Sequence, residues 1–318
     1  MLGIHPVPTL VTLGNLLCGF GSIILAMRAY NPPANFPNLN TPYDCLYWSG
    51  LLIFAAMVFD VLDGKVARWT KSASKFGMEM DSLCDVVSFG VAPAVLVKAI
   101  IDQQLVMHES YPMLDRYIWP MLAVYVCCAA LRLARYNIEA ESGHRDFFFG
   151  MPSPGAAGCV ASLAVLISRQ QTTFQQNQET FDIVSKTLHR PVLLAFPFIM
   201  LVLGMLMVSR VHYPHVGDRL LRGRKSFLFI LVLGLSLIIT VLFHEVVLTL
   251  AFNGYMLFGL LKELWITIFP SMRPAAWNEE VPPVPPAANE SAPATPPAPA
   301  QPALPADPEP QKTETYRI

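Results

Sequence analysis

Residues 60–85 read DVLDGKVARWTKSASKFGMEMDSLCD and place four aspartates, two glycines and an arginine at fixed intervals. Written as a pattern, the stretch is D-x2-D-G-x2-A-R-x8-G-x3-D-x3-D, and strongly apolar sequence precedes and follows it. Carboxylates within a membrane-spanning segment are energetically costly and usually mark a functional site. The stretch therefore predicts a polar site built into membrane-spanning helices.

The composition of the whole chain agrees with a membrane location. The 318 residues are 53% hydrophobic and 14% charged, whereas a soluble domain carries about a quarter charged residues. The net charge of −1 gives no basic field, so we expect no nucleic-acid partner. Because a span needs roughly 20 apolar residues, we predict an all-α integral membrane protein with about eight transmembrane helices. The expected spans are 8–28, 45–69, 81–101, 117–138, 152–168, 191–209, 226–243 and 246–269.

The end of the chain has a different composition. Proline and alanine dominate residues 271–318, and such a segment cannot bury a hydrophobic core. We therefore predict a disordered tail at 271–318, after a membrane domain at 1–225 that contains the aspartates and two additional transmembrane helices at 226–270.

The distribution of basic residues predicts the orientation in the membrane. Twelve lysines and arginines fall in the connections after the second, fourth and sixth expected spans, and six fall on the opposite side. Cytoplasmic loops are enriched in these residues. We therefore expect the protein to lie in the cell membrane or inner membrane, with both termini and the aspartates facing the cytoplasm.

The spacing of the aspartates predicts that they meet. Asp60 and Asp63 are three residues apart and share one helical face, and Asp81 and Asp85, four apart, share another. Two antiparallel helices would bring the four carboxylates together, where they repel one another unless a cation or a proton intervenes. Mg²⁺ and Mn²⁺ prefer such oxygen ligands, and a metal held this way suits chemistry on phosphate.

Other residues of the stretch suit a phosphate-bearing ligand. Gly64 and Gly77 leave room for a bulky group to approach the backbone, and Arg68 can bind a phosphate with two parallel hydrogen bonds. Two alternatives stay open at this point. The aspartates can pair with Arg68 and nearby lysines as a solvated network, or they can line the path of a cation-conducting or proton-coupled transporter.

The complete pattern in residues 60–85 resembles the signature of the CDP-alcohol phosphatidyltransferase family, in every fixed position. Within that family, residues 85–94, 131–137, 149–157 and 206–214 are similar to the bacterial-type phosphatidylserine synthases, and residues 8–15 fit the first helix. The resemblance covers residues 6–225. It implies a helical bundle, CDP-diacylglycerol as phosphatidyl donor, L-serine as acceptor, surrounding membrane lipids and a homodimer.

Carried onto this sequence, the resemblance also implies roles for single residues. The implied ligands of Mg²⁺ or Mn²⁺ are Asp60, Asp63, Asp81 and Asp85, and Asp85 is also implied as the general base. The implied pocket for the CDP moiety comprises Gly64, Ala67, Arg68 and Gly77. We add Asn15 to this pocket, since it is a polar group at helix depth, although a role in helix packing is an alternative.

The acceptor end is predicted from Arg132 and Arg135, which share one helical face and suit a carboxylate. Asn137 and Ser88 are expected to join them. Anchoring to lipid headgroups is the alternative for the two arginines. The alternatives for the whole chain are the same transfer to glycerol 3-phosphate, an inositol phosphate or an amino alcohol, or a metal-ion transporter.

Overall fold

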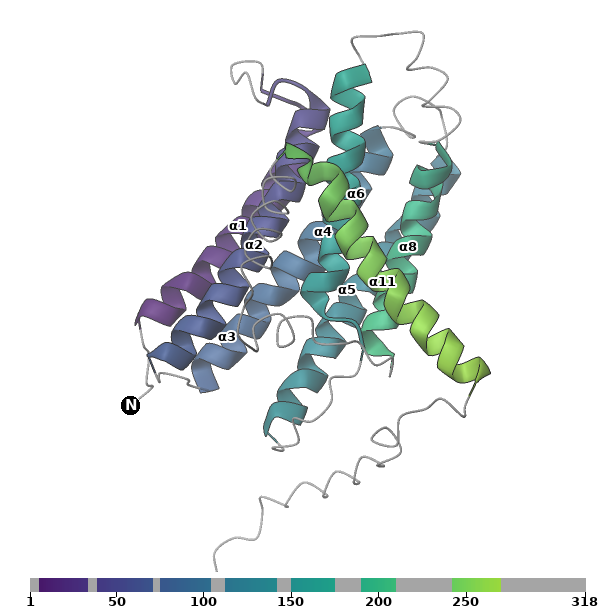
Figure 1. The fold of residues 1–318 in the computed structure, drawn as a ribbon. Helices are drawn as coiled ribbons and strands as arrows, with labels where there is room; N and C mark the ends of the chain where they lie inside the picture. The colour runs from purple at the N-terminus through teal and green to yellow at the C-terminus, as the bar shows by residue number, and fades with distance from the viewer. Residues whose placement is uncertain are drawn as a thin grey trace, which may run out of the picture. The chain divides into compact units, whose positions relative to one another are not determined.

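The structure is a computed structural model that describes residues 6–33, 39–70, 75–103, 112–141, 150–174, 190–209 and 242–269. Every regular element in these ranges is helical (Figure 1). In chain order they are α1 (Pro6–Arg28), α2 (Pro42–Trp69), α3 (Lys75–Asp85), the π-helix η1 (Val86–Val91), α4 (Ala92–Ile101), α5 (Pro112–Glu141), α6 (Ser153–Phe174), α8 (Arg190–Val208) and α11 (His244–Ile268).

Six stretches of these helices are long and apolar enough to cross a membrane: Pro8–Arg28, Pro42–Ala67, Phe76–Ile101, Arg116–Ile138, Pro191–Val208 and His244–Ile266. Each coincides with an expected span, which confirms the all-α membrane fold. The expected span at 152–168 forms helix α6, which is not among these six stretches. The one at 226–243 lies almost wholly outside the described residues, so the number eight is not confirmed.

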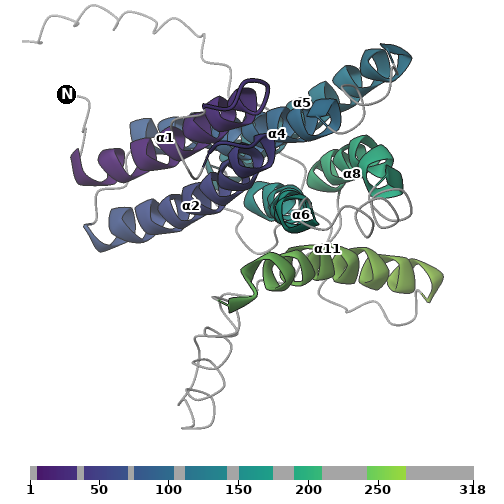
Figure 2. The ribbon, with the colours of Figure 1, turned by 90° about the horizontal axis from the view of Figure 1, so that it is seen from above.

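Small residues let the helices approach closely. Between α1 and α2, which run side by side in Figure 1, the hydroxyls of Ser22 and Ser49 are 2.9 Å apart. Helix α6 contacts α2, α4, α8 and α11 (Figure 2), and its buried face carries Ala157, Ala161 and Ala164. Between membrane helices such small side chains allow close van der Waals packing.

The third span is continuous but changes its helical geometry directly after Asp85. The π-helix η1 inserts between α3 and α4, and Pro93 follows at the start of α4. Pro93 has no N–H to donate to the carbonyl of Phe89, four residues earlier. The Tyr125 hydroxyl of α5 donates to that oxygen at 2.9 Å. The turn after Asp85 is thereby held in place by a neighbouring helix.

A second turn fixes the start of α6. Gly150 has φ +85°, and a Cβ at this position would meet backbone oxygens at the end of α8. The next residue, Met151, donates its backbone N–H to the oxygen of Leu206 at 3.1 Å. The beginning of α6, including Ser153, is therefore anchored to the end of α8.

Polar contacts fasten the opposite ends of the helices. Tyr47 precedes Asp60 by about 20 Å of helix, and its hydroxyl lies 2.6 Å from Nε2 of His244 at the start of α11. Next to this pair, Nε of Arg169 lies 3.4 Å from Oε1 of Glu245. We call this the far end of the bundle, and the end that carries Asp60 and Asp63 the aspartate end.

All described residues belong to one compact unit, Met1–Ser271. The predicted tail at 271–318 lies outside the described residues. The predicted boundary between a catalytic domain at 1–225 and two further helices at 226–270 stays a prediction.

Candidate metal centre and active site

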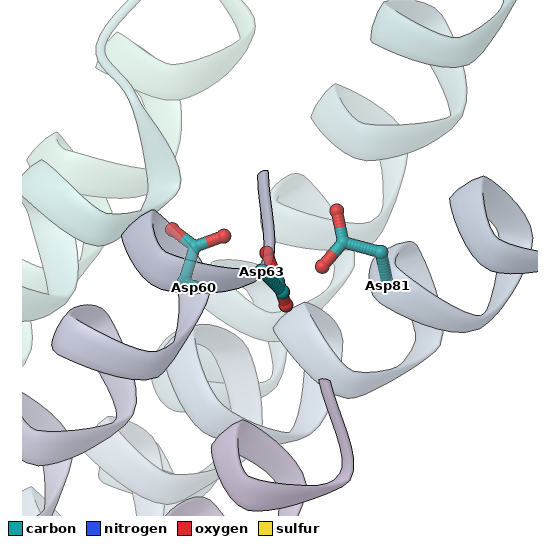
Figure 3. A group of neighbouring side chains, drawn as sticks. All are labelled: Asp60, Asp63 and Asp81. Carbon is teal, nitrogen blue, oxygen red and sulfur yellow. The ribbon is translucent and has the colours of Figure 1, made fainter. Parts of the chain in front are cut away.

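Three of the four aspartates form a tight group at the aspartate end. Asp60 and Asp63 project from the last part of α2, and Asp81 projects from α3 (Figure 3). One carboxylate oxygen of each lies within 4.8 Å of the others. The group forms because Asp60 and Asp63 are one turn apart on α2 and Asp81 reaches them from α3.

The group has the properties of a site for a hard divalent cation. Asp63 is only 5% exposed, and it lies within hydrogen-bond reach of Asp81. Within the described residues, Asp63 Oδ2 and Asp81 Oδ1 are buried without a hydrogen-bond partner. Buried carboxylates this close need a proton or a cation between them. An all-oxygen set of ligands suits Mg²⁺-like ions, so the residues present fit a divalent metal.

Asp85 lies beside this group but is held separately. Its side chain is 7% exposed and interacts electrostatically with Asp60 and Asp81. Asn15 of α1 donates Nδ2–H to Asp85 Oδ1 at 2.9 Å. The predicted contact of Asn15 with the nucleotide stays a prediction, and the Asn15 Oδ1 atom, buried without a partner among the described residues, is available to a ligand.

Ser88 is connected to Asp85 by way of Asn15. Its hydroxyl donates to the backbone oxygen of Asn15 at 3.0 Å, and both residues are fully buried. Gly19 of α1 makes this possible, because a Cβ there would lie 2.7 Å from the Cα of Ser88. The π-helix, α1 and Asp85 are thus joined in one buried arrangement. The predicted contact of Ser88 with the substrate L-serine stays a prediction.

The sequence analysis missed Thr12. Its side chain is 5% exposed, its hydroxyl donates to the backbone oxygen of Pro8 at 3.1 Å, and it interacts with the Asp63 carboxylate. A signal was present in the sequence, since Thr12 and Asn15 are three residues apart and share a face of the first helix. That face meets the aspartates.

Arg132 lies at the same end of the bundle. Its Nη1 donates to the Ser153 hydroxyl at 2.8 Å, and the guanidinium interacts electrostatically with Asp60 and Asp85. The Nε atom is buried without a partner in the described part of the chain. A half-buried arginine with a buried, unsatisfied donor atom suits an anionic ligand.

The remaining predicted acceptor residues are on the same helix, α5. Asn137 Nδ2 donates to the hydroxyl of Ser82 at 3.0 Å, so Asn137 ties α5 to α3 between Asp81 and Asp85. Arg135 is half-buried. Its grouping with Arg132 around an acceptor stays a prediction.

The predicted nucleotide residues flank the aspartates in sequence. Gly64 is exposed, and nothing lies within 4 Å of a Cβ built on it. Ala67 of α2 and Gly77 of α3 are half-buried. Arg68 belongs to α2, but its side chain lies outside the described part. The open space at Gly64 fits a bulky ligand, and the roles of the four residues stay predictions.

Comparison with known proteins agrees with this site. A model of the CDP-alcohol phosphatidyltransferase family matches residues 5–208. The chain is 32% identical over 217 residues to the CDP-diacylglycerol–serine O-phosphatidyltransferase of Helicobacter pylori (strain ATCC 700392 / 26695), covering 68% of this chain and 80% of that protein. The equally named protein of Methanocaldococcus jannaschii is 29% identical over 211 residues, covering 66% and 82%. That of Bacillus subtilis (strain 168) is 28% identical over 214 residues, covering 66% and 90%. The chain therefore belongs to the CDP-alcohol phosphatidyltransferase family and is a membrane-embedded transferase.

Proposed function

We propose that the protein transfers the phosphatidyl group of CDP-diacylglycerol to L-serine and forms phosphatidylserine and CMP. The names of its relatives support this choice of substrates. The observation that carries the proposal is the group of three aspartates with Asp85 and Arg132 beside it. Such an arrangement can bind a pyrophosphate, accept a proton and hold an anionic acceptor.

In the proposed reaction, the hydroxyl oxygen of serine forms a bond to the phosphorus of the phosphatidyl group. The bond from that phosphorus to the oxygen of CMP breaks, and the hydroxyl proton goes to a carboxylate. We assign Asp85 as this base, because it is buried and its Oδ1 is fixed by Asn15. A base must be held within hydrogen-bond reach of the proton that it removes.

Asp60, Asp63 and Asp81 would hold Mg²⁺ or Mn²⁺, with Asp85 as a further ligand. Such an ion, when bound, neutralises charge on the pyrophosphate and on the departing CMP. Gly64, Ala67, Arg68 and Gly77 would enclose the CDP moiety, and the open space at Gly64 supports this.

The acceptor end would use Arg132, whose free Nε and bonded Nη1 leave part of the guanidinium for the carboxylate of serine. Arg135 would add positive charge. Ser88 and Asn137 would act indirectly, because they bond to Asn15 and Ser82. A cytoplasmic position of this site and a homodimer are further parts of the proposal, which rest on the basic loops and on the resemblance.

The test is CMP release by the full-length protein purified in detergent, with CDP-diacylglycerol, Mg²⁺ or Mn²⁺ and a panel of acceptors. We expect release that requires L-serine and is lost in Asp85→Asn. Release of CMP with another alcohol in place of serine would show that serine is not the acceptor, while still supporting the phosphatidyl transfer. Ion flux through reconstituted protein without any CMP release would favour a transporter.

The acceptor role of Arg132 has its own test. Arg132→Lys keeps the positive charge but removes the planar guanidinium, which can bind a carboxylate with two parallel hydrogen bonds. We therefore expect a higher KM for L-serine and an unchanged KM for CDP-diacylglycerol. Arg116→Lys, at an exposed arginine near the start of the same helix, is the control. An unchanged KM for serine in Arg132→Lys would rule out this assignment.

A further inference from the structure

A tight turn leads into α6 and is held against the end of α8. Its first residue, Gly150, has φ +85°, and a Cβ there would lie 2.4 Å from the backbone oxygen of Met207. The next residue, Met151, is fully buried and donates its backbone N–H to the oxygen of Leu206 at 3.1 Å. These backbone contacts determine the position of Ser153, which follows two residues later and begins α6.

Helix α8 also packs on α5, the helix that carries Arg132. A Cβ at Gly204 of α8 would lie 3.3 Å from the Cα of Tyr125 and 3.4 Å from the Cβ of Cys128, both on α5. The missing side chain therefore lets the two helices approach closely, and Figure 2 shows them next to each other. Cys128 precedes Arg132 by four residues, so the two lie on the same face of α5. Arg132 and Ser153 are thus both positioned by α8.

The side chains of these two residues meet in a hydrogen bond. Arg132 Nη1 donates to the Ser153 hydroxyl at 2.8 Å, a distance typical of a bond from a charged donor. Ser153 is fully buried, where a hydroxyl needs a partner. Pro152 and Pro154 restrict the backbone on either side of it. The hydroxyl therefore has little freedom to follow the arginine, and it determines where Nη1 lies.

The bond to Ser153 leaves the edge of the guanidinium that suits a carboxylate. Nε and Nη2 present parallel N–H bonds along one edge, and two such donors match the two oxygens of a carboxylate. Nη1, which bonds to Ser153, does not belong to this edge. Nε of Arg132 is buried without a partner among the described residues. A guanidinium held at Nη1 therefore presents its other edge in a defined direction.

We propose that Ser153 is a positioning residue for Arg132, and that it thereby favours acceptors that carry a carboxylate. This inference rests on the proposed function, in which Arg132 binds the carboxylate of L-serine. Ser153 acts through the arginine and not on the reacting atoms. It therefore affects binding of the acceptor and leaves the three aspartates and the CDP moiety unaffected.

The experiment compares Ser153→Ala and Ser153→Cys with the unaltered full-length protein in detergent, by CMP release. Alanine removes the acceptor of the Arg132 bond, and cysteine replaces it with a weak acceptor of similar size. We expect both variants to raise the KM for L-serine roughly three- to tenfold, as for the loss of one hydrogen bond. The KM for CDP-diacylglycerol and kcat should stay unchanged.

Ser162→Ala is the matched control, because it removes another buried hydroxyl from the same helix. The Ser162 hydroxyl accepts a hydrogen bond from Asn253 Nδ2 at 3.2 Å and so takes part in packing α11 on α6. This variant should keep both KM values. A rise in the KM for serine in Ser153→Ala but not in Ser162→Ala would separate positioning of Arg132 from a general loosening of α6.

A double variant tests whether Ser153 acts through Arg132. Lysine has no planar edge to align, so Arg132→Lys combined with Ser153→Ala should raise the KM for serine no more than Arg132→Lys alone. An unchanged KM for serine in the Ser153 variants would refute the inference alone. An equal rise in both KM values, or a loss confined to kcat, would do the same. An unaltered protein that releases CMP without using serine would refute the proposed function and the inference together.

Discussion

At the residue scale, Asp63 is the most enclosed of the three grouped aspartates and has a buried oxygen without a partner among the described residues. Asp63→Asn keeps the shape but removes the charge. We expect affinity for Mn²⁺ to fall by on the order of 100-fold or more, measured from the metal dependence of CMP release. Asp44→Asn, at the start of the same helix, should bind Mn²⁺ normally. Equal affinities in the two variants would contradict a metal centre at this group.

Asn15 provides a second prediction at this scale. A hydrogen bond to a charged group contributes about 1.5–3 kcal/mol, so Asn15→Ala should lower kcat roughly ten- to hundredfold if the bond to Asp85 is needed in the reaction. Stopped CMP-release assays at saturating substrates measure this. Ser22→Ala removes another buried hydrogen bond from α1 and should retain full kcat. A change confined to the KM for CDP-diacylglycerol would show that Asn15 binds the nucleotide instead.

At the scale of elements, the π-helix η1 divides the third span into two α-helices, α3 before it and α4 after it. Insertions of this kind often occur at functional sites. Here the insertion follows Asp85, and Ser88 within it bonds to the backbone of Asn15. The local irregularity therefore joins α1 to the carboxylate that we propose as the base.

The turn before α6 provides a prediction at this scale. Gly150→Ala places a Cβ on a residue with φ +85° and against backbone oxygens of α8. The left-handed conformation alone costs about 1–2 kcal/mol for alanine, so the melting temperature should fall clearly. Gly155→Ala, whose Cβ would meet ordinary contacts of 3.6 Å or more, should change it little. Identical melting temperatures would show that the turn is not constrained as described.

At the scale of the whole molecule, the last residues of the sequence are expected to be dispensable for the reaction. Deleting residues 271–318 should leave kcat and both KM values unchanged, because a segment so rich in proline and alanine cannot contribute to a packed core. The measurement is CMP release by the truncated protein, with melting temperature as the control for folding. A large loss of activity would show that the segment contributes to catalysis.

The positions of most helices could be predicted from local sequence. Apolar length identified the six stretches that form helices long and apolar enough to cross a membrane, since a span requires roughly 20 apolar residues. Hydropathy was less informative for α6, because its small residues serve packing rather than contact with lipid. The change to π geometry after Asp85 could not be predicted, because it depends on the fit of η1 against α1 and α5.

The sequence by itself determined the class of the fold and the ingredients of the site. Spacings of three and four residues placed Asp60 with Asp63 and Asp81 with Asp85 on shared helical faces, because the helical repeat is a local property. The tertiary structure decided which side chains meet. It grouped Asp60, Asp63 and Asp81, and it brought Asn15 of α1, 70 residues away in the sequence, to Asp85. Such pairings depend on how helices pack and rotate against each other, and no local spacing encodes that.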